Sequence, residues 1–536
     1  MSARSGDGNA ADHPPGPPGP GLVAGQDAAD GLDAAPGQDA ARGLDPSAGA
    51  LPPASADPSG GLDRSGELRE LAGDCVHCGF CLPACPTYQL WGEEMDSPRG
   101  RIHLMTQILD GARAGEAAAV HFDRCLGCMA CVPACPSGVR YDRLIEAARG
   151  WSEEPPAGTR PLPARSLRDR AARAAIFEIF PYPRRLRLLM APLRAAQRAG
   201  LDQLLAGRPG TGGEPAGGGQ PTAGGRGRRR AGMADRLSPE LAAALRVAPG
   251  QRPSRRGAAR GAAGGRPPRR TRPPLPELMP AGGPRRAVVG MLTGCVQQIF
   301  FPEVNAATAR VLAAEGCDVV IPRRQGCCGA LSLHAGRRAE AARFARRSIT
   351  AFERTGADAV VVNAAGCGSA MKEYADLLAD DAQWAGRAAE IGGRVRDLTE
   401  FLAELGPVAP RHPLPVTVAY HDSCHLAHSQ RITRQPRDLL RAIPGLRLAE
   451  IPDGGTCCGS AGIYNLVQPG TASELGKRKA LAVRATGAGL LVSANPGCAV
   501  QISSALAAQG SALPMAHVAE VLDASIQGAD VSALLI

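Results

Sequence analysis

The chain has 536 residues, a formal net charge of +10 at pH 7 and only 3% aromatic residues. Its length exceeds what one hydrophobic core sustains, which excludes a single-domain protein. Its 67 glycines and 47 prolines exclude a uniformly packed globule and indicate low-complexity segments.

Residues 1–65 consist mainly of Gly, Pro, Ala and Asp, without a helical or alternating apolar period. Such a segment buries too little apolar surface to offset the entropy of ordering, so we expect a disordered tail. It lacks the apolar stretch of a signal peptide, and no apolar run in the chain reaches the roughly 18 residues needed to span a bilayer. We therefore expect a cytoplasmic protein whose 17 cysteines are reduced.

Residues 66–151 carry two copies of the motif Cys-x-x-Cys-x-x-Cys-x-x-x-Cys-Pro. In bacterial ferredoxins this spacing places three cysteines around one side of a [4Fe-4S] cluster, and the Cys-Pro cysteine of the other motif supplies the fourth ligand. Apolar residues at helical spacing predict short helices over 102–109 and 141–148. We predict a small α-helical domain with two clusters. The predicted ligands are Cys75, Cys78, Cys81 and Cys135 for the first cluster, and Cys125, Cys128, Cys131 and Cys85 for the second.

A structural zinc site and inert buried thiols are the alternative interpretations of these eight cysteines. Zinc takes four ligands, usually as two Cys-x-x-Cys pairs. A third regularly spaced cysteine followed by Cys-Pro, occurring twice, favours iron-sulfur clusters.

The next two segments connect the cysteine-rich parts of the chain. Residues 152–205 alternate Arg with apolar residues and predict a helical connector. Residues 206–286 hold 17 arginines, no lysine and 4 acidic residues, so we expect a basic, disordered Arg/Gly/Pro-rich linker that accounts for the positive charge. The linker has no aromatic residues for base stacking, which argues against a specific nucleic-acid function.

Beyond the linker, strand-like apolar runs alternate with helical runs rich in Ala and Arg, which predicts a largely parallel α/β fold. We expect two repeats, over 287–410 and 411–536, and therefore an α+β protein overall. The predicted strands are 287–292, 318–321, 359–362, 416–420, 446–451 and 490–493.

Eight cysteines mark the internal duplication. A single Cys, a Cys-Cys-Gly and another single Cys recur after 129 to 131 residues, at positions where parallel strands end and sites form. Four thiolates in each half could bind a further cluster or accept electrons, and inert core thiols are the alternative. These second-tier metal or redox residues are Cys295, Cys327, Cys328 and Cys367 in one half, and Cys424, Cys457, Cys458 and Cys498 in the other.

Single cysteines and histidines give weaker signals. Cys317 has no counterpart in the second repeat, and we interpret it as a core thiol. His421 and His425 flank Cys424 but have no histidine equivalents in the first repeat, so we expect them to orient or tune a centre rather than to bind it. His77, inside the first cysteine loop, is expected to be a hydrogen-bond neighbour of a cluster.

The sequence resembles the iron-sulfur subunit of glycolate oxidase, with heterodisulfide-reductase-like Cys-Cys-Gly domains, over about 66–205 and 285–526. Specific motifs carry the resemblance. They include Cys85-Pro86-Thr87-Tyr88, Pro98-Arg99-Gly100-Arg101-Ile102, Asn305-Ala306-Ala307-Thr308, Gly326-Cys327-Cys328-Gly329 and Cys457-Cys458-Gly459-Ser460.

The resemblance implies an electron-transfer subunit with two [4Fe-4S] clusters. It implies an FAD-containing partner subunit and a second flavoprotein-like subunit, which oxidise glycolate to glyoxylate, and a quinone-type acceptor at the inner face of the cell membrane. The chain has no flavin fingerprint, so we expect no flavin and no catalytic residue on it. Heterodisulfide-reductase subunits end each repeat with Cys-x-x-Cys, whereas Ala370 and Gln501 stand at the last position here, which argues against their unusual clusters.

Two other functions remain open at this point. One is an iron-sulfur subunit of a lactate or glycerol-3-phosphate dehydrogenase complex, with the same clusters and a different partner. The other is a catalytic subunit that reduces disulfides at the Cys-Cys-Gly site, as in heterodisulfide reductase.

Overall fold

The computed structural model describes residues 65–111, 116–152, 165–198, 275–452, 455–511 and 513–535. The tail that we expect to be disordered, up to residue 64, and residues 206–274 of the basic linker lie outside the described residues. Among the described residues, no helix is long and apolar enough to cross a membrane.

The first part of the structure is helical, as the sequence predicts. The helix predicted over 102–109 begins at Pro98, and Ser97 caps it by accepting a hydrogen bond from the Gly100 main-chain nitrogen across 3.0 Å. The apolar residues that predict this helix and the one over 141–148 are buried in one core. The elements are α1 (Ser65–Gly73), α2 (Pro86–Trp91), η1 (Glu94–Asp96), α3 (Pro98–Leu109), α4 (Glu116–Arg124) and α5 (Tyr141–Gly150).

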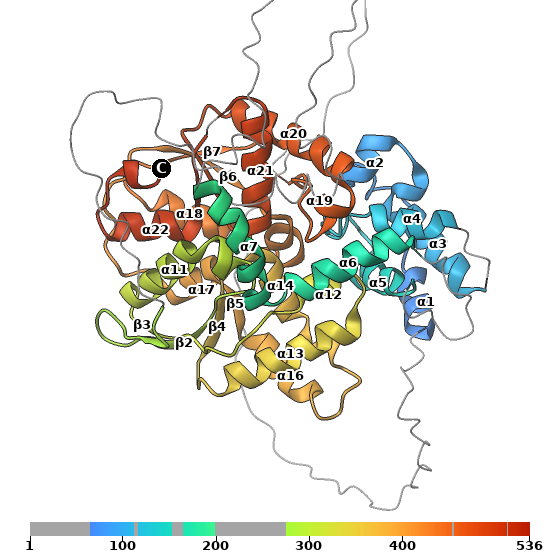
Figure 1. Cartoon of the computed structure of the whole chain (residues 1–536), viewed down its shortest axis with the longest axis horizontal. Coiled ribbons are helices and arrows are strands. Elements are labelled where there is room, and N and C mark those ends of the chain that lie inside the picture. The colour runs from blue at the N-terminus through green and yellow to red at the C-terminus, as the bar shows by residue number, and fades with distance from the viewer. Residues whose placement is uncertain are drawn as a thin grey trace, which may run out of the picture. The chain divides into compact units, whose positions relative to one another are not determined.

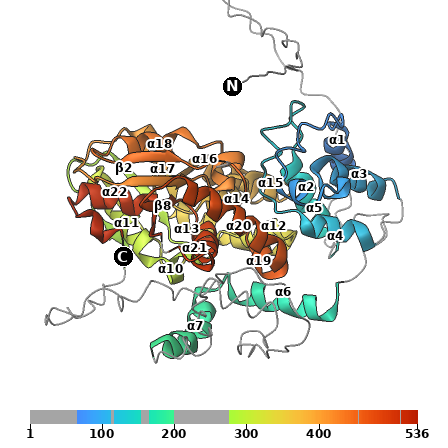
Figure 2. The ribbon, with the colours of Figure 1, turned by 90° about the horizontal axis from the view of Figure 1, so that it is seen from above.

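The helical connector forms α6 (Leu167–Ile179) and α7 (Pro183–Arg198), which Figure 2 shows in teal. α7 packs on the first repeat, because Leu186 and Met190 are buried against Ile299. The guanidinium of Arg337 lies 4.5 Å from the ring centre of Phe177 and holds α6 against the same repeat.

The two repeats form two sheets of equivalent topology. The first sheet has the order β1-β3-β2-β4-β5 and the second has the order β7-β6-β8-β9. All pairs are parallel except β1 with β3. The strands are β1 (Leu278–Met279), β2 (Ala287–Leu292), β3 (Cys317–Val320), β4 (Ala359–Val362) and β5 (Val395–Asp397), followed by β6 (Thr417–His421), β7 (Arg447–Glu450), β8 (Leu490–Ser493) and β9 (Met515–His517).

One hydrophobic core joins the two sheets. It contains residues of both sheets and of helices α11 (Pro302–Ala314) and α22 (Val518–Ile526), which lie side by side between the sheets (Figure 1). An ion pair of 2.6 Å between Arg310 and Asp523 joins these two helices. Cys317 is fully buried in this core, which confirms its interpretation as a core thiol.

Further helices complete the two repeats, and two of them, Leu398–Leu405 and Arg434–Arg441, also bury residues in the core between the sheets. In the first repeat they are α10 (Gln297–Phe300), α12 (Ala330–His334), α13 (Arg338–Glu353), α14 (Ala365–Lys372), α15 (Tyr374–Leu377), α16 (Ala385–Arg394) and α17 (Leu398–Leu405). In the second they are the π-helical turn η3 (His425–Ser429), α18 (Arg434–Arg441), α19 (Tyr464–Val467), α20 (Pro469–Ala485), α21 (Pro496–Ala508) and the 3₁₀ turn η4 (Val531–Ala533).

The α+β fold with a helical domain and a duplicated α/β domain is confirmed, and all six predicted strands occur within one or two residues of their predicted bounds. Three short strands escape prediction. β5 and β9 have only three residues each and run directly into capped helices, so they show no alternation. Residues 275–286, which we assigned to the linker, instead open the first repeat, because β1 pairs with β3.

Candidate iron-sulfur centres

Each cysteine motif of the helical domain folds into the same tight loop. The second and fourth inner positions of both loops have positive φ: 53° at His77 and 87° at Gly79 in the first, 64° at Gly127 and 60° at Met129 in the second. Left-handed backbone at non-glycine residues is costly and is retained mainly where a site requires it. The loops therefore have the curvature needed to direct three thiols to one point.

The Cys-Pro cysteines lie beside the opposite motif. One small cavity is lined by Cys75, Cys78 and Cys81 together with Cys135, and Cys131 of the second motif also reaches it. On the other side, burial raises the pKa of Cys131, and nearby Cys128, Cys125 and Cys85 raise it further. The structure thus brings together four thiols in each predicted set, and donors of this kind fit a cubane cluster.

Two arginines at the start of α3 lie at the two cysteine loops. The Nη1 of Arg99 donates to the His77 main-chain oxygen across 3.0 Å, in the first loop. Arg101 is fully buried, and it donates to the main-chain oxygen of His121 across 2.7 Å and to Asp96 across 3.3 Å. Between them, a side chain at Gly100 would overlap the main-chain oxygen of Glu94, so only glycine fits.

Positive charge lowers the pKa of one thiol in the second loop. Burial opposes ionisation of Cys125, but Arg101 and Arg149, with a hydrogen bond from the Tyr141 hydroxyl, bring its pKa below the ordinary value of a thiol. Thiolates and a negatively charged cluster are stabilised by such cations. Arg101 and Arg149 could not be identified as functional residues from their sequence positions, and the only signal for Arg101 was its place in the Pro-Arg-Gly-Arg motif.

In the first repeat, four cysteines form a row between the ends of β2 and β4. The sulfurs of Cys295 and Cys327 are 3.5 Å apart, and Cys328 is hydrogen-bonded to both Cys327 and Cys367. These contacts lower the pKa of Cys328 well below the usual value of a thiol. Cys295, Cys327 and Cys328 are each at most 4% exposed.

The second repeat reproduces this row. Cys424 contacts Cys457, Cys457 contacts Cys458, and Cys458 contacts Cys498. In both repeats the glycine of the Cys-Cys-Gly sequence has φ near 90° and donates its main-chain N–H to the first of the paired cysteines across 3.4 Å. The structure therefore brings together all eight repeat cysteines as two sets of four.

The second row begins against the ferredoxin-like domain. Cys128 is packed in one buried cluster with Cys424 and Cys457, and the charges of Cys128 and Cys457 influence each other. Arg149 donates to the main-chain oxygen of His334 across 2.5 Å, which joins the same domain to the first repeat. The thiols predicted to bind the second cluster thus lie close to the thiols of the second repeat.

The histidines take different positions. His77 is exposed, and it is its main-chain oxygen that contacts Arg99. The ring of His425 lies 4.7 Å from that of His334, and burial lowers the pKa of His425 to about 3. His421 lies beside Cys458 and Cys498 at the far end of the second row, and the ligand atoms of the three residues all lie within 4.8 Å of one another.

Comparisons with known protein families agree with the division of the chain into a helical domain with two cysteine motifs, a connector and two repeats. Residues 72–139 match the family described as "4Fe-4S dicluster domain". Residues 289–372 and 418–503 match the family "Cysteine-rich domain", and 168–208 match "Glycolate oxidase iron-sulfur subunit, linker region".

Similar proteins of known name cover most of the chain. The "Probable glycolate oxidase iron-sulfur subunit" of Bacillus subtilis (strain 168) is 35% identical over 84% of this chain and 93% of its own length. The "Glycolate oxidase iron-sulfur subunit" of Escherichia coli (strain K12) is 33% identical over 80% of this chain and 89% of its own length. "Lactate utilization protein A" of Halalkalibacterium halodurans is 31% identical, but over 44% of this chain and 96% of its own length.

Proposed function

The chain belongs to the family of glycolate oxidase iron-sulfur subunits, and from this membership we propose that it conducts electrons within a glycolate-oxidising complex. It is an electron-transfer subunit of an oxidoreductase, and it carries a domain for two [4Fe-4S] clusters. Such clusters accept and release single electrons.

The eight ferredoxin-type cysteines bind the two clusters in the crossed arrangement predicted from their spacing. The observation that carries this assignment is the position of the Cys-Pro cysteines, each beside the three thiols of the opposite motif. Arg99 and Arg101 place one positive charge at each loop. The cysteines of the two repeats form a further set of metal-binding or redox groups.

The substrate chemistry belongs to partner subunits. An FAD-containing subunit, with a second flavoprotein-like subunit, oxidises glycolate to glyoxylate, which releases two electrons and two protons. The present chain takes these electrons one at a time and passes them toward a quinone-type acceptor. It works in the reducing cytoplasm, bound peripherally at the inner face of the membrane where quinones dissolve.

The relatives favour glycolate over lactate as the substrate of the partner. The lactate utilization protein matches only 44% of this chain, whereas the two glycolate oxidase subunits match 80% or more. A disulfide reductase lacks this support, and the last cysteine of its Cys-x-x-Cys is replaced by Ala370 and Gln501.

The proposal is tested with the complete complex, purified without oxygen. Glycolate should produce the electron paramagnetic resonance signals of reduced [4Fe-4S] clusters, and a soluble quinone should remove them. About eight iron atoms per chain should belong to the two clusters. Reduction by lactate or glycerol 3-phosphate in place of glycolate would refute the substrate assignment, and disulfide turnover by the isolated chain that is lost in Cys327→Ser or Cys457→Ser would refute the electron-transfer role.

A further inference from the structure

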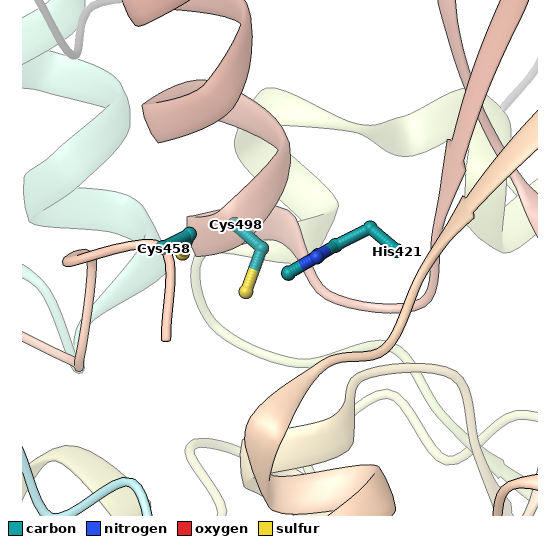
Figure 3. Close-up of side chains that lie close together, drawn as sticks. All are labelled: His421, Cys458 and Cys498. Atoms are coloured by element: carbon teal, nitrogen blue, oxygen red, sulfur yellow. The ribbon is translucent and has the colours of Figure 1, made fainter. Parts of the chain in front are cut away.

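A histidine and two cysteines converge in the second repeat. His421 is the last residue of β6, Cys458 lies in the Cys-Cys-Gly loop, and Cys498 lies in the first turn of α21. Their ligand atoms are all within 4.8 Å of one another. Figure 3 shows the imidazole of His421 directed toward the sulfur of Cys498.

The imidazole of His421 is buried among the thiols of the second repeat. The residue is 1% exposed, and its ring nitrogens make no hydrogen bond to a nitrogen or oxygen atom in the described part of the chain; their polar neighbours are the sulfurs of Cys458 and Cys498. Leaving a buried polar group without a strong partner destabilises the folded state. A bound cation would satisfy one of these nitrogens.

The two neighbouring thiols face the same ring. The sulfur of Cys498 contacts both Cys458 and His421. The amide nitrogen of Asn495 contacts the same sulfur at 3.4 Å. A thiolate is the form that binds metal.

The first repeat cannot form this group of ligands. Leu292 ends β2 at the position that His421 occupies at the end of β6. Cys328 and Cys367 are the counterparts of Cys458 and Cys498, so the two rows differ in this one ligand. The duplicated domain thus contains an internal control for the role of the histidine.

We propose that His421, Cys458 and Cys498 bind a single zinc ion in the second repeat. Two ligand atoms on one tetrahedral zinc ion are about 3.3–3.8 Å apart, given bonds of about 2.0–2.3 Å, so small side-chain rotations close the site. A cubane cluster would instead attach each thiolate to a separate iron. The three residues leave one tetrahedral position for a further ligand, and Cys457, hydrogen-bonded to Cys458, is the adjacent thiol. Cys₃His is an established ligand set of structural zinc.

The zinc site goes beyond the electron-transfer role, because Zn²⁺ has no redox chemistry under these conditions. The ion fixes the end of β6, the Cys-Cys-Gly loop and the start of α21 relative to one another. The opposite end of the same row, at Cys424, lies next to Cys128 of the ferredoxin-like domain. The site therefore stabilises the surface against which the second cluster loop packs.

The experiment measures zinc and iron in the full-length chain purified without oxygen and without added metal. The wild type should contain one equivalent of zinc in addition to its iron. His421→Leu, which reproduces the first repeat, should lose the zinc and keep the iron and both cluster signals. His421→Cys, which restores a ligand, should retain the zinc, and X-ray absorption at the zinc edge should change from three sulfurs and one nitrogen to four sulfurs.

Equivalent cysteines of the two repeats provide a matched pair of variants. Cys498→Ser should lose the zinc, whereas Cys367→Ser should retain it. A wild-type chain without zinc would overturn the proposal, and so would zinc retained in His421→Leu or lost equally from both serine variants. Loss of four irons from His421→Leu would also overturn it, because the histidine would then serve a cluster. Absence of glycolate-dependent cluster reduction would leave the zinc content unaffected, so the two proposals fail separately.

Discussion

The hydroxyl of Tyr464 donates a hydrogen bond to the main-chain oxygen of Arg124 across 3.0 Å, between residues 340 positions apart. Arg124 directly precedes Cys125, the first cysteine of the second ferredoxin-type motif, and Tyr464 begins α19 just after the Cys-Cys-Gly loop of the second repeat. This bond therefore joins the loop of a predicted cluster to the loop of a repeat.

We expect Tyr464→Phe to loosen this junction while keeping the ring in place. The loss of one buried hydrogen bond should reduce stability by about 1 kcal/mol and increase amide exchange in the Cys125 loop. Hydrogen–deuterium exchange measures the effect. Tyr374→Phe is the matched control, because the Tyr374 hydroxyl donates to Cys328 within the first repeat across 2.7 Å. Equal protection of the Cys125 loop in both variants would contradict the prediction.

Arg99→Gln should make one of the two clusters harder to reduce. The guanidinium contacts the first loop at the His77 oxygen and pairs with Glu94 across 2.6 Å, so its removal deletes a positive charge and frees a negative one. The interaction of a partly exposed charge with the cluster contributes about 0.2–1 kcal/mol. The reduction potential of the cluster in the first loop should therefore fall by roughly 10–40 mV. Redox titration followed by paramagnetic resonance measures it.

The control for Arg99 is Arg143→Gln, because Arg143 belongs to the same domain but pairs with Glu67 and Asp376. Replacing Arg143 should leave the reduction potentials of both clusters unchanged. A shift of both clusters by the same amount in Arg99→Gln would show that the charge acts on the whole domain rather than on the first loop.

Much of the fold was predictable because its signals are local. The ferredoxin spacing is a pattern of eleven residues, and buried parallel strands such as 359–362 are continuous apolar runs. The duplication was visible because the cysteines recur at nearly constant offsets. The strands that escaped prediction have two or three residues, too few to show a period.

The long-range contacts could not be predicted in the same way. His421 and Cys498 are 77 positions apart, and only the alignment of β6 with β8 brings them together. The absence of a histidine from the first repeat suggested an indirect role, but the structure places the ring among the thiols. Contacts of Arg149 with His334 and of Tyr464 with Arg124 likewise depend on how the domains pack.

The glycines of the two Cys-Cys-Gly sequences should differ in their tolerance of alanine. Both have φ near 90°, where a side chain costs about 1–3 kcal/mol. A Cβ at Gly459 would lie 2.7 Å from the Ala472 oxygen, whereas one at Gly329 would lie 3.1 Å from the Ala341 oxygen. Gly459→Ala should therefore lower the melting temperature more than Gly329→Ala, as measured by circular dichroism. An equal decrease would mean that the backbone conformation alone determines the cost.

Stability should fall on acidification, and His517 should be one cause. Its Nε2 donates to the Asn363 oxygen across 2.9 Å, and its Nδ1 accepts from the Ala519 N–H across 3.0 Å at the start of α22. The ring must therefore be neutral, and burial lowers the pKa of His517 to about 4. Between pH 6.5 and 4 the unfolded chain binds the extra proton, so stability decreases as pH falls through this range and is unaffected by this group above it.

The full effect of His517 amounts to about 3 kcal/mol for a shift of this size. His517→Asn keeps a side chain that can cap α22 but does not titrate, so it should lose some stability at pH 7.5 and show a weaker dependence on pH below 6.5. Melting temperatures of variant and wild type, compared between pH 7.5 and 4.5, measure the difference. His412→Asn, at an exposed position, should retain the wild-type dependence. The two histidine variants would have identical pH profiles if the proton bound by the unfolded chain came from other groups alone.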